Sequence, residues 1–124
     1  MLPSPADSVL RAIGGTPVVR LRRVVSSTDA DVLIKLESVN PTGSYKDRMA
    51  LAMIEGAEAR GLLRPGMRVV EFTGGSTGSS LAMVCAAKGY RFVVLSSDAF
   101  SREKLLTWRR WALNCEWCRA TAGR

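Results

Sequence analysis

Apolar and polar positions alternate along the chain in a way that predicts strands and helices in turn. Residues 16–21 (TPVVRL) and 31–37 (DVLIKLE) are rich in β-branched and apolar side chains and are bounded by turn residues, which is typical of strands. Residues 40–44 (NPTGS) predict a turn or loop. From Lys46 to Arg60 apolar residues recur about every four positions, which predicts a helix with a broad buried face and Gly61 as its C-cap.

The second half of the chain continues this alternation. Residues 67–73 (MRVVEFT) and 90–97 (YRFVVLSS) predict strands, and between them lie a tight loop at 74–78 and a small-residue helix at 79–88 that Gly89 ends. A further helix should begin near Arg102 with Ser101 as its cap. This order implies βαβ units, a parallel sheet and right-handed crossovers, with ligands beyond the carboxyl ends of the strands.

Composition narrows the protein class. The 124 residues suffice for one small domain, and 47% hydrophobic with 23% charged residues is ordinary for a soluble globular protein. No apolar run approaches the length of a membrane span, and the first residues lack the features of a signal peptide, so we expect a cytoplasmic protein without a membrane partner. Three cysteines, an odd number, do not suggest a disulfide framework.

The net charge of +7 suggests an anionic partner, but its distribution weakens that reading. Residues 1–100 carry twelve Lys/Arg and nine Asp/Glu, whereas residues 101–124 carry six and two. The excess is therefore concentrated in the tail, and we expect no nucleic-acid partner. Because the chain has no histidine, acid–base chemistry must come from lysine, carboxylates, hydroxyls or a cofactor.

The segment NPTGSYKDR (40–48) places Lys46 at or near a helix N-terminus, where the helix dipole is positive. That field favours the uncharged amine, which is the form that Schiff-base chemistry needs. Ser44 can cap the helix, and Asp47 suits its first turn. A solvated lysine after a capped turn is the alternative.

The segment EFTGGSTG (71–78) places a glycine-rich turn between a strand and a helix. Backbone N–H groups at such a helix start form a generic site for a phosphate or carboxylate. The segment lacks the ending of a P-loop and does not match the dinucleotide fingerprint. Small residues that let helix and strand pack closely are the alternative explanation.

Together these segments resemble a known family. The motifs, in order, are IGGTP (13–17), LE (36–37), NPTGSYKDR (40–48), EFTGGSTG (71–78) and AKGY (87–90). They resemble the N-terminal part of the cysteine synthase family, the O-acetylserine sulfhydrylases and relatives, which are fold-type II enzymes dependent on pyridoxal phosphate. The resemblance runs from about residue 10 to about residue 106 and implies an α/β fold: part of a three-layer parallel-sheet domain of the tryptophan synthase β-like type, truncated.

The resemblance also implies roles for residues. Lys46 matches the lysine that binds pyridoxal 5′-phosphate covalently and later shuttles protons. The loop that grips the α-carboxylate of the amino-acid substrate is matched by Thr73, Gly74, Gly75, Ser76 and Thr77. The family usually has Thr-Ser-Gly-Asn-Thr-Gly here, and its asparagine contacts the 3′-hydroxyl of the cofactor. Ser76 replaces that asparagine and reaches less far. No metal site is implied.

Family members are typically two to three times longer than this chain, and full-length relatives are commonly homodimers. The loop that binds the cofactor phosphate and the residue at the pyridine nitrogen would lie in the absent part, so we expect little or no turnover from this chain. The full enzyme would form cysteine from O-acetylserine; relatives use serine with homocysteine, or deaminate serine or threonine. A non-enzymatic truncated product is the alternative.

Residues 108–124 contain all three tryptophans and a Cys115–Cys118 pair, and they do not resemble the family's glycine turn and apolar strand. Shifting the reading frame by one nucleotide permits the sequence MAALGAELRMVPSDGG. That sequence does resemble the family's glycine turn and apolar strand. We therefore expect residues 1–107 to be the enzyme part and 108–124 an out-of-frame tail, from a frameshift or a sequencing error. At face value, the tail could bind nucleic acid or form a redox or zinc site, although only Cys85 could join the pair and zinc needs about four ligands.

Overall fold

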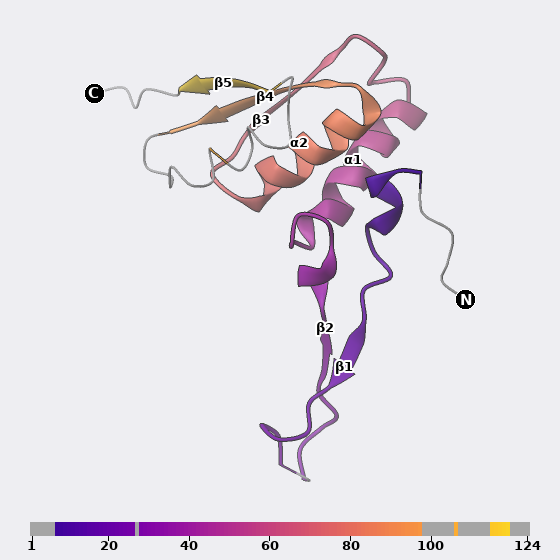
Figure 1. Ribbon diagram of the computed structural model, residues 1–124, viewed down its shortest axis with the longest axis vertical. Coiled ribbons are helices and arrows are strands. Elements are labelled where there is room, and N and C mark those ends of the chain that lie inside the picture. The colour runs from indigo at the N-terminus through magenta and orange to yellow at the C-terminus, as the bar shows by residue number, and fades with distance from the viewer. Residues whose placement is uncertain (1–6, 27, 98–105, 107–114, 120–124) are drawn as a thin grey trace.

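The computed structural model describes residues 7–26, 28–97, 106 and 115–119, the last five by their backbone (Figure 1). Its α-helices are α1 (Lys46–Ala59) and α2 (Ser76–Lys88), and short 3-10 turns lie at Val9–Ala12 (η1) and Glu37–Val39 (η2). Its strands are β1 (Val18–Arg20), β2 (Leu33–Lys35), β3 (Arg68–Phe72), β4 (Arg91–Ser96) and β5 (Cys115–Arg119). The predicted strands and the first helix are therefore confirmed to within a few residues. The helix predicted near Arg102 lies outside the described residues except for Leu106, which is helical.

The main sheet has the order β3-β4-β5, and both pairings are parallel. Phe72 pairs with Leu95, and Ser96 pairs with Arg119. The predicted α/β fold with a parallel sheet is confirmed. Residues 115–119, which lie in the tail predicted to be out of frame, add a parallel strand beside β4.

The second α-helix begins earlier than the sequence predicts. Gly75, with an extended backbone at φ −149° and ψ −151°, is its N-cap, so Ser76, Thr77 and Gly78 belong to the first turn rather than to a loop. Serine and threonine compete with helical hydrogen bonds in a helix interior, but the N–H groups of a first turn have no helical partner to lose. At the other end Gly89 adopts φ +79° and ends the helix as predicted.

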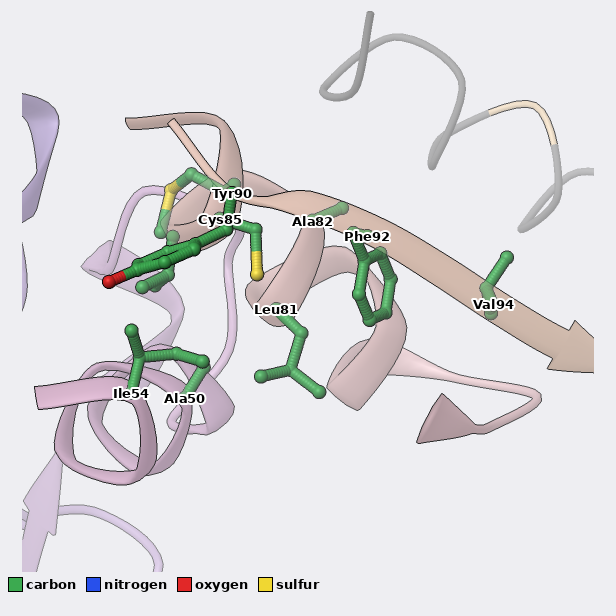
Figure 2. Close-up of a cluster of buried hydrophobic side chains, with 10 residues drawn as sticks. Ala50, Ile54, Leu81, Ala82, Cys85, Tyr90, Phe92 and Val94 are labelled. Carbon is green, nitrogen blue, oxygen red and sulfur yellow. The ribbon is translucent and has the colours of Figure 1, made fainter. Parts of the chain in front are cut away.

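The core lies between the two helices and one face of the main sheet. Figure 2 shows side chains from α1, α2 and β4 converging there. On β4 the alternating Phe92 and Val94 are each 1% exposed, and Leu81 of α2 is equally buried. The opposite face of the sheet is more open, since Val70 of β3 is 56% exposed.

The first two strands form a separate antiparallel ribbon in which Val18 pairs with Lys35 and Arg20 with Leu33. All six residues of the ribbon are exposed. Figure 1 shows it projecting away from the helices and the main sheet. The apolar side chains of Val18, Val19, Leu33 and Ile34 are thus left without a core in the described part of the chain. Within the described residues, no helix combines the length and apolarity that crossing a membrane requires.

Candidate functional site

Lys46 is the first residue of α1, as the sequence predicts. The Ser44 Oγ accepts a hydrogen bond from the backbone N–H of Lys46 at 3.1 Å, but Tyr45 rather than Ser44 occupies the N-cap. The chain turns sharply into this position because Gly43 adopts φ +75° and donates its N–H to the Asn40 carbonyl at 2.7 Å. The Lys46 side chain is partly buried, and its Nζ lies 4.7 Å from the centroid of the Tyr45 ring. This contact gives the amine a defined place at the start of the helix.

The loop before Lys46 is fastened by Asn40, which is 3% exposed. The Asn40 Nδ2 donates to the Glu37 carbonyl at 2.8 Å and to the Glu37 Oε2 at 2.9 Å. The Asn40 Oδ1 accepts from the Gly14 N–H at 2.9 Å, so the loop is also bound to the segment before β1. Both polar atoms of this amide therefore help to hold the loop.

A charged cluster supports the same loop from behind. The Arg48 Nη2 donates to the Thr16 Oγ1 at 3.0 Å, and the Thr16 hydroxyl donates to the Glu37 Oε1 at 2.7 Å. Arg48 also binds the Glu37 carboxylate directly through two nitrogens. The Arg48 guanidinium, followed by the Thr16 hydroxyl, lowers the pKa of Glu37 to about 2, and Glu37 in turn raises the pKa of Arg48. This pair therefore stays ionised through the neutral range.

Asp47, immediately after Lys46, is fully buried. Its Oδ2 accepts from the Thr42 N–H at 2.8 Å, and its Oδ1 accepts from the Thr42 hydroxyl at 2.5 Å and from the Ser80 hydroxyl at 2.6 Å. Thr42 and Ser80 also face each other, with 3.3 Å between their hydroxyl oxygens. Asp47 therefore connects the loop before Lys46 to α2.

The second predicted loop lies at the carboxyl end of β3. Thr73 is 8% exposed, and its N–H donates to the Leu95 carbonyl at 3.0 Å, which extends the β3–β4 pairing by one residue. The Thr73 Oγ1 accepts from the Gly75 N–H at 3.3 Å, so the side chain shapes the turn. Gly74 and Gly75 make that turn, and Ser76 and Thr77 open α2. First-turn N–H groups at this position can bind a carboxylate or phosphate.

The structure thus connects the first predicted segment to α2, the helix that the second predicted segment opens. Ser80 lies one helical turn after Ser76; its hydroxyl donates to Asp47, and its oxygen lies 3.3 Å from the hydroxyl oxygen of Thr42. Sequence reasoning missed Thr42 and Ser80 and gave Asp47 only a role in the helix dipole. One signal was available: Ser80 precedes the apolar run LAMVC, where a buried hydroxyl needs a partner.

A family model described as "Pyridoxal-phosphate dependent enzyme" matches residues 9–123. The chain belongs to the pyridoxal-phosphate-dependent enzyme family. The family resemblance and the cofactor predicted from the sequence motifs are thereby confirmed.

Within this pyridoxal-phosphate-dependent family, two relatives define the similarity. A cysteine synthase of Staphylococcus aureus (strain Mu50) is 54% identical over 104 residues, which cover 84% of this chain and 34% of that protein. An O-ureido-L-serine synthase of Streptomyces lavendulae is 51% identical over 98 residues, which cover 79% of this chain and 30% of that protein. The chain spans about a third of the length of these relatives.

Solved structures show the same pyridoxal-phosphate-dependent fold. The crystal structure of O-ureido-L-serine synthase matches with a TM-score of 0.85 at 44% identity and covers 94% of this chain and 36% of that chain. A hydrogen sulfide-producing enzyme from Fusobacterium nucleatum matches with a TM-score of 0.87 at 38% identity, covering 98% of this chain and 39% of that one. The prediction of a partial fold-type II domain is confirmed.

The described residues fit one end of the family's cofactor. Lys46 presents a partly buried amine, to which an aldehyde could bind, and the turn from Thr73 to Thr77 presents first-turn N–H groups, which could bind an anion. Each of the two α-helices in the described residues therefore begins with one of these two elements. If α1 and α2 hold these two elements, neither of their N-termini is available to bind the cofactor phosphate.

Proposed function

We propose that this chain forms the N-terminal part of a β-replacement enzyme that makes cysteine from O-acetylserine with pyridoxal phosphate. The observation that carries this proposal is the connection of Lys46 to the start of α2 through Asp47, Thr42 and Ser80. The similarity to cysteine synthases supports the substrate class, a small amino acid. We further propose a cytoplasmic homodimer for the complete enzyme, with no nucleic-acid partner.

Each predicted residue has a distinct task in this proposal. Lys46 would hold the aldehyde of the cofactor and then accept and return the proton at the substrate α-carbon through its Nζ. The turn from Thr73 to Thr77 would orient the substrate carboxylate, through the first-turn N–H groups of Ser76 and Thr77 and the hydroxyl of Thr73. Ser76 would donate to the cofactor hydroxyl. The cofactor, when bound, supplies the electron sink.

The first experiment tests the lysine. The purified chain is mixed with pyridoxal phosphate, its visible absorption is recorded, and bound cofactor is fixed by borohydride and mapped by mass spectrometry. We expect the label on Lys46 in preference to Lys35 and Lys88, because Lys46 is the only one of these three described lysines at the start of a helix. Lys46→Ala should remove the absorption, whereas Lys88→Ala, the matched control, should keep it. Even labelling of all lysines would contradict the proposal.

Turnover is proposed to require more than this chain. The relatives are about three times as long, and the exposed apolar side chains of the ribbon and of Val70 supply a surface for further chain to cover. The test adds the polypeptide that corresponds to the remaining part of the Staphylococcus aureus cysteine synthase and measures cysteine formation from O-acetylserine and sulfide. Activity of the mixture but not of either part supports the proposal. Full activity of this chain alone would refute it, and no activity with no association would favour a non-enzymatic product.

We also propose that residues from about 108 onward are read out of frame. The shifted frame must encode Leu across Asn114–Cys115 and Val across Trp117–Cys118, which are residues suited to the strand that occupies Cys115–Arg119. The same strand disfavours a redox pair, because Cα atoms three residues apart in a strand are separated by about 10 Å. Sequencing the DNA across codons 105–124 tests the proposal. A verified reading without an open continuation in the other frame would end it.

A further inference from the structure

We propose that Asp47 is a positioning residue that sets the place of Lys46 relative to the first turn of α2. The proposal rests on the proposed function of Lys46 and of the Thr73–Thr77 turn. In it, the buried carboxylate of Asp47 fixes the position of Lys46 relative to that turn. Three hydrogen bonds of 2.5 to 2.8 Å reach that carboxylate, two from Thr42 on the loop before Lys46 and one from Ser80 on α2.

The surroundings of Asp47 make its geometry demanding. The side chain is 0% exposed, and no lysine or arginine of the described residues forms an ion pair with it. The neighbouring Arg48 is engaged by Glu37 and Thr16 instead. The negative charge therefore depends on Thr42, on Ser80 and on the positive end of the α1 dipole. Moving the Thr42 loop away removes two of the three donors to this buried carboxylate, and moving α2 away removes the third, so the arrangement resists displacement.

Asp47 and its partner Ser80 lie close in sequence to Lys46 and to Ser76, respectively. Lys46 is adjacent to Asp47 in the first turn of α1. Ser80 lies four residues, or one helical turn, after Ser76 on the buried side of α2, where it is 0% exposed. The Thr42 and Ser80 hydroxyls lie 3.3 Å apart, which closes a triangle with the carboxylate. Asp47, in the first turn of α1, is thus hydrogen-bonded to Ser80, one turn after the start of α2.

The experiment compares hydroxyl loss with hydroxyl retention. Ser80→Ala and Thr42→Val remove donors, whereas Ser80→Thr and Thr42→Ser keep them, and Asp47→Asn removes the charge. The first readout is hydrogen exchange at the Thr42 N–H, which should become about tenfold faster in Asp47→Asn because its charged acceptor is lost. The second is the share of borohydride-fixed pyridoxal phosphate on Lys46 relative to Lys88. We expect that share to fall several-fold in Ser80→Ala and to recover in Ser80→Thr.

A matched control separates positioning from general stability. Ile54 lies on the core side of α1 and is 4% exposed. Ile54→Val therefore loosens the packing of α1 without removing a hydrogen bond to Asp47. If Ser80→Ala lowers the melting temperature like Ile54→Val yet leaves the label on Lys46 unchanged, Asp47 is only structural and the inference is wrong. Unchanged Thr42 exchange in Asp47→Asn would overturn it as well. If the unaltered chain shows no preference for Lys46, the proposed function itself fails, whatever the Thr42 exchange shows, and no reactive lysine remains to be positioned.

Discussion

Arg48 binds the Glu37 carboxylate with two nitrogens, Nε to Oε2 at 2.8 Å and Nη2 to Oε1 at 3.0 Å. The pair joins the first turns of α1 to the short η2 turn, eleven residues apart in the chain. Because Asn40 also binds Glu37, this contact holds the base of the loop that presents Lys46. Bidentate arginine–carboxylate geometry fixes orientation as well as distance.

This pair predicts a loss of stability in acid. The pKa of Glu37 is lowered from 4.5 to about 2, chiefly by Arg48, so the stabilisation is complete above about pH 4.5 and is lost as the pH falls toward 2. We expect urea unfolding to show a lower free energy at about pH 3 than at about pH 6. Glu37→Gln should be less stable than the unaltered chain at about pH 6 and should lose less on acidification.

The ribbon offers a matched control for that experiment. Asp31 bonds Arg20 at 2.9 Å, but the two side chains are 68% and 55% exposed. Exposed ion pairs of this kind contribute little, so Asp31→Asn should leave the acid dependence almost unchanged. An equal effect of Asp31→Asn and Glu37→Gln would show that the cluster at Glu37 has no special weight.

Gly14 predicts a backbone and packing effect behind the same cluster. It adopts φ +87°, and an added Cβ would lie 2.9 Å from the Arg48 Nη1. Its neighbour Gly15 adopts φ +57°, and an added Cβ there would meet nothing within 4 Å. We expect Gly15→Ala to lower the free energy of unfolding by about 1 kcal/mol and Gly14→Ala by about 2 kcal/mol or more. Equal losses in denaturant unfolding would mean that Arg48 moves aside freely.

The far ends of the helices predict an alkaline transition. The Tyr90 hydroxyl donates to the Glu58 Oε1 at 2.8 Å, and the Lys88 Nζ donates to its Oε2 at 2.8 Å. Glu58 raises the pKa of both Tyr90 and Lys88 above 10.0 and 10.5, so this stabilisation is complete below about pH 10 and is lost as the pH rises further. Unfolding measured from about pH 8 to about pH 11 should be steep in the unaltered chain and flatter in Glu58→Gln. Glu55→Gln, whose longer contact with Lys88 is 3.5 Å, should behave nearly like the unaltered chain.

Apolar spacing and turn residues predicted most helices and strands, because these elements follow local sequence preferences. The apolar spacing of α1 predicted its extent, and Gly89 ends α2 as predicted. The C-cap of α1 is Arg60 rather than the predicted Gly61, which follows it at φ +68°. The strand at Cys115–Arg119 was not predicted, because residues 108–124 were interpreted as an out-of-frame tail. It forms through pairing with the central strand β4, which is a tertiary effect.

The candidate site divides in the same way. Lys46 and the Thr73–Thr77 turn were chosen because each lies at the start of a helix and because the surrounding motifs resemble the family's; their roles stay predictions. The bond from Ser80 to Asp47 joins residues 33 apart in sequence, and no local spacing encodes such a contact. This hydrogen bond depends on the packing of α1 against α2, which is a tertiary contact.

The two faces of the main sheet predict a contrast within one substitution type. Val94 on β4 is 1% exposed and faces the core, whereas Val70 on β3 is 56% exposed. Val94→Ala should lower the free energy of unfolding by about 2 to 3 kcal/mol, from lost transfer energy and a residual cavity. Val70→Ala should cost less than about 1 kcal/mol in denaturant unfolding of the isolated chain. If the cost of Val70→Ala rises with protein concentration, the open face is covered by association, because removing apolar surface weakens a contact that only assembled chains make.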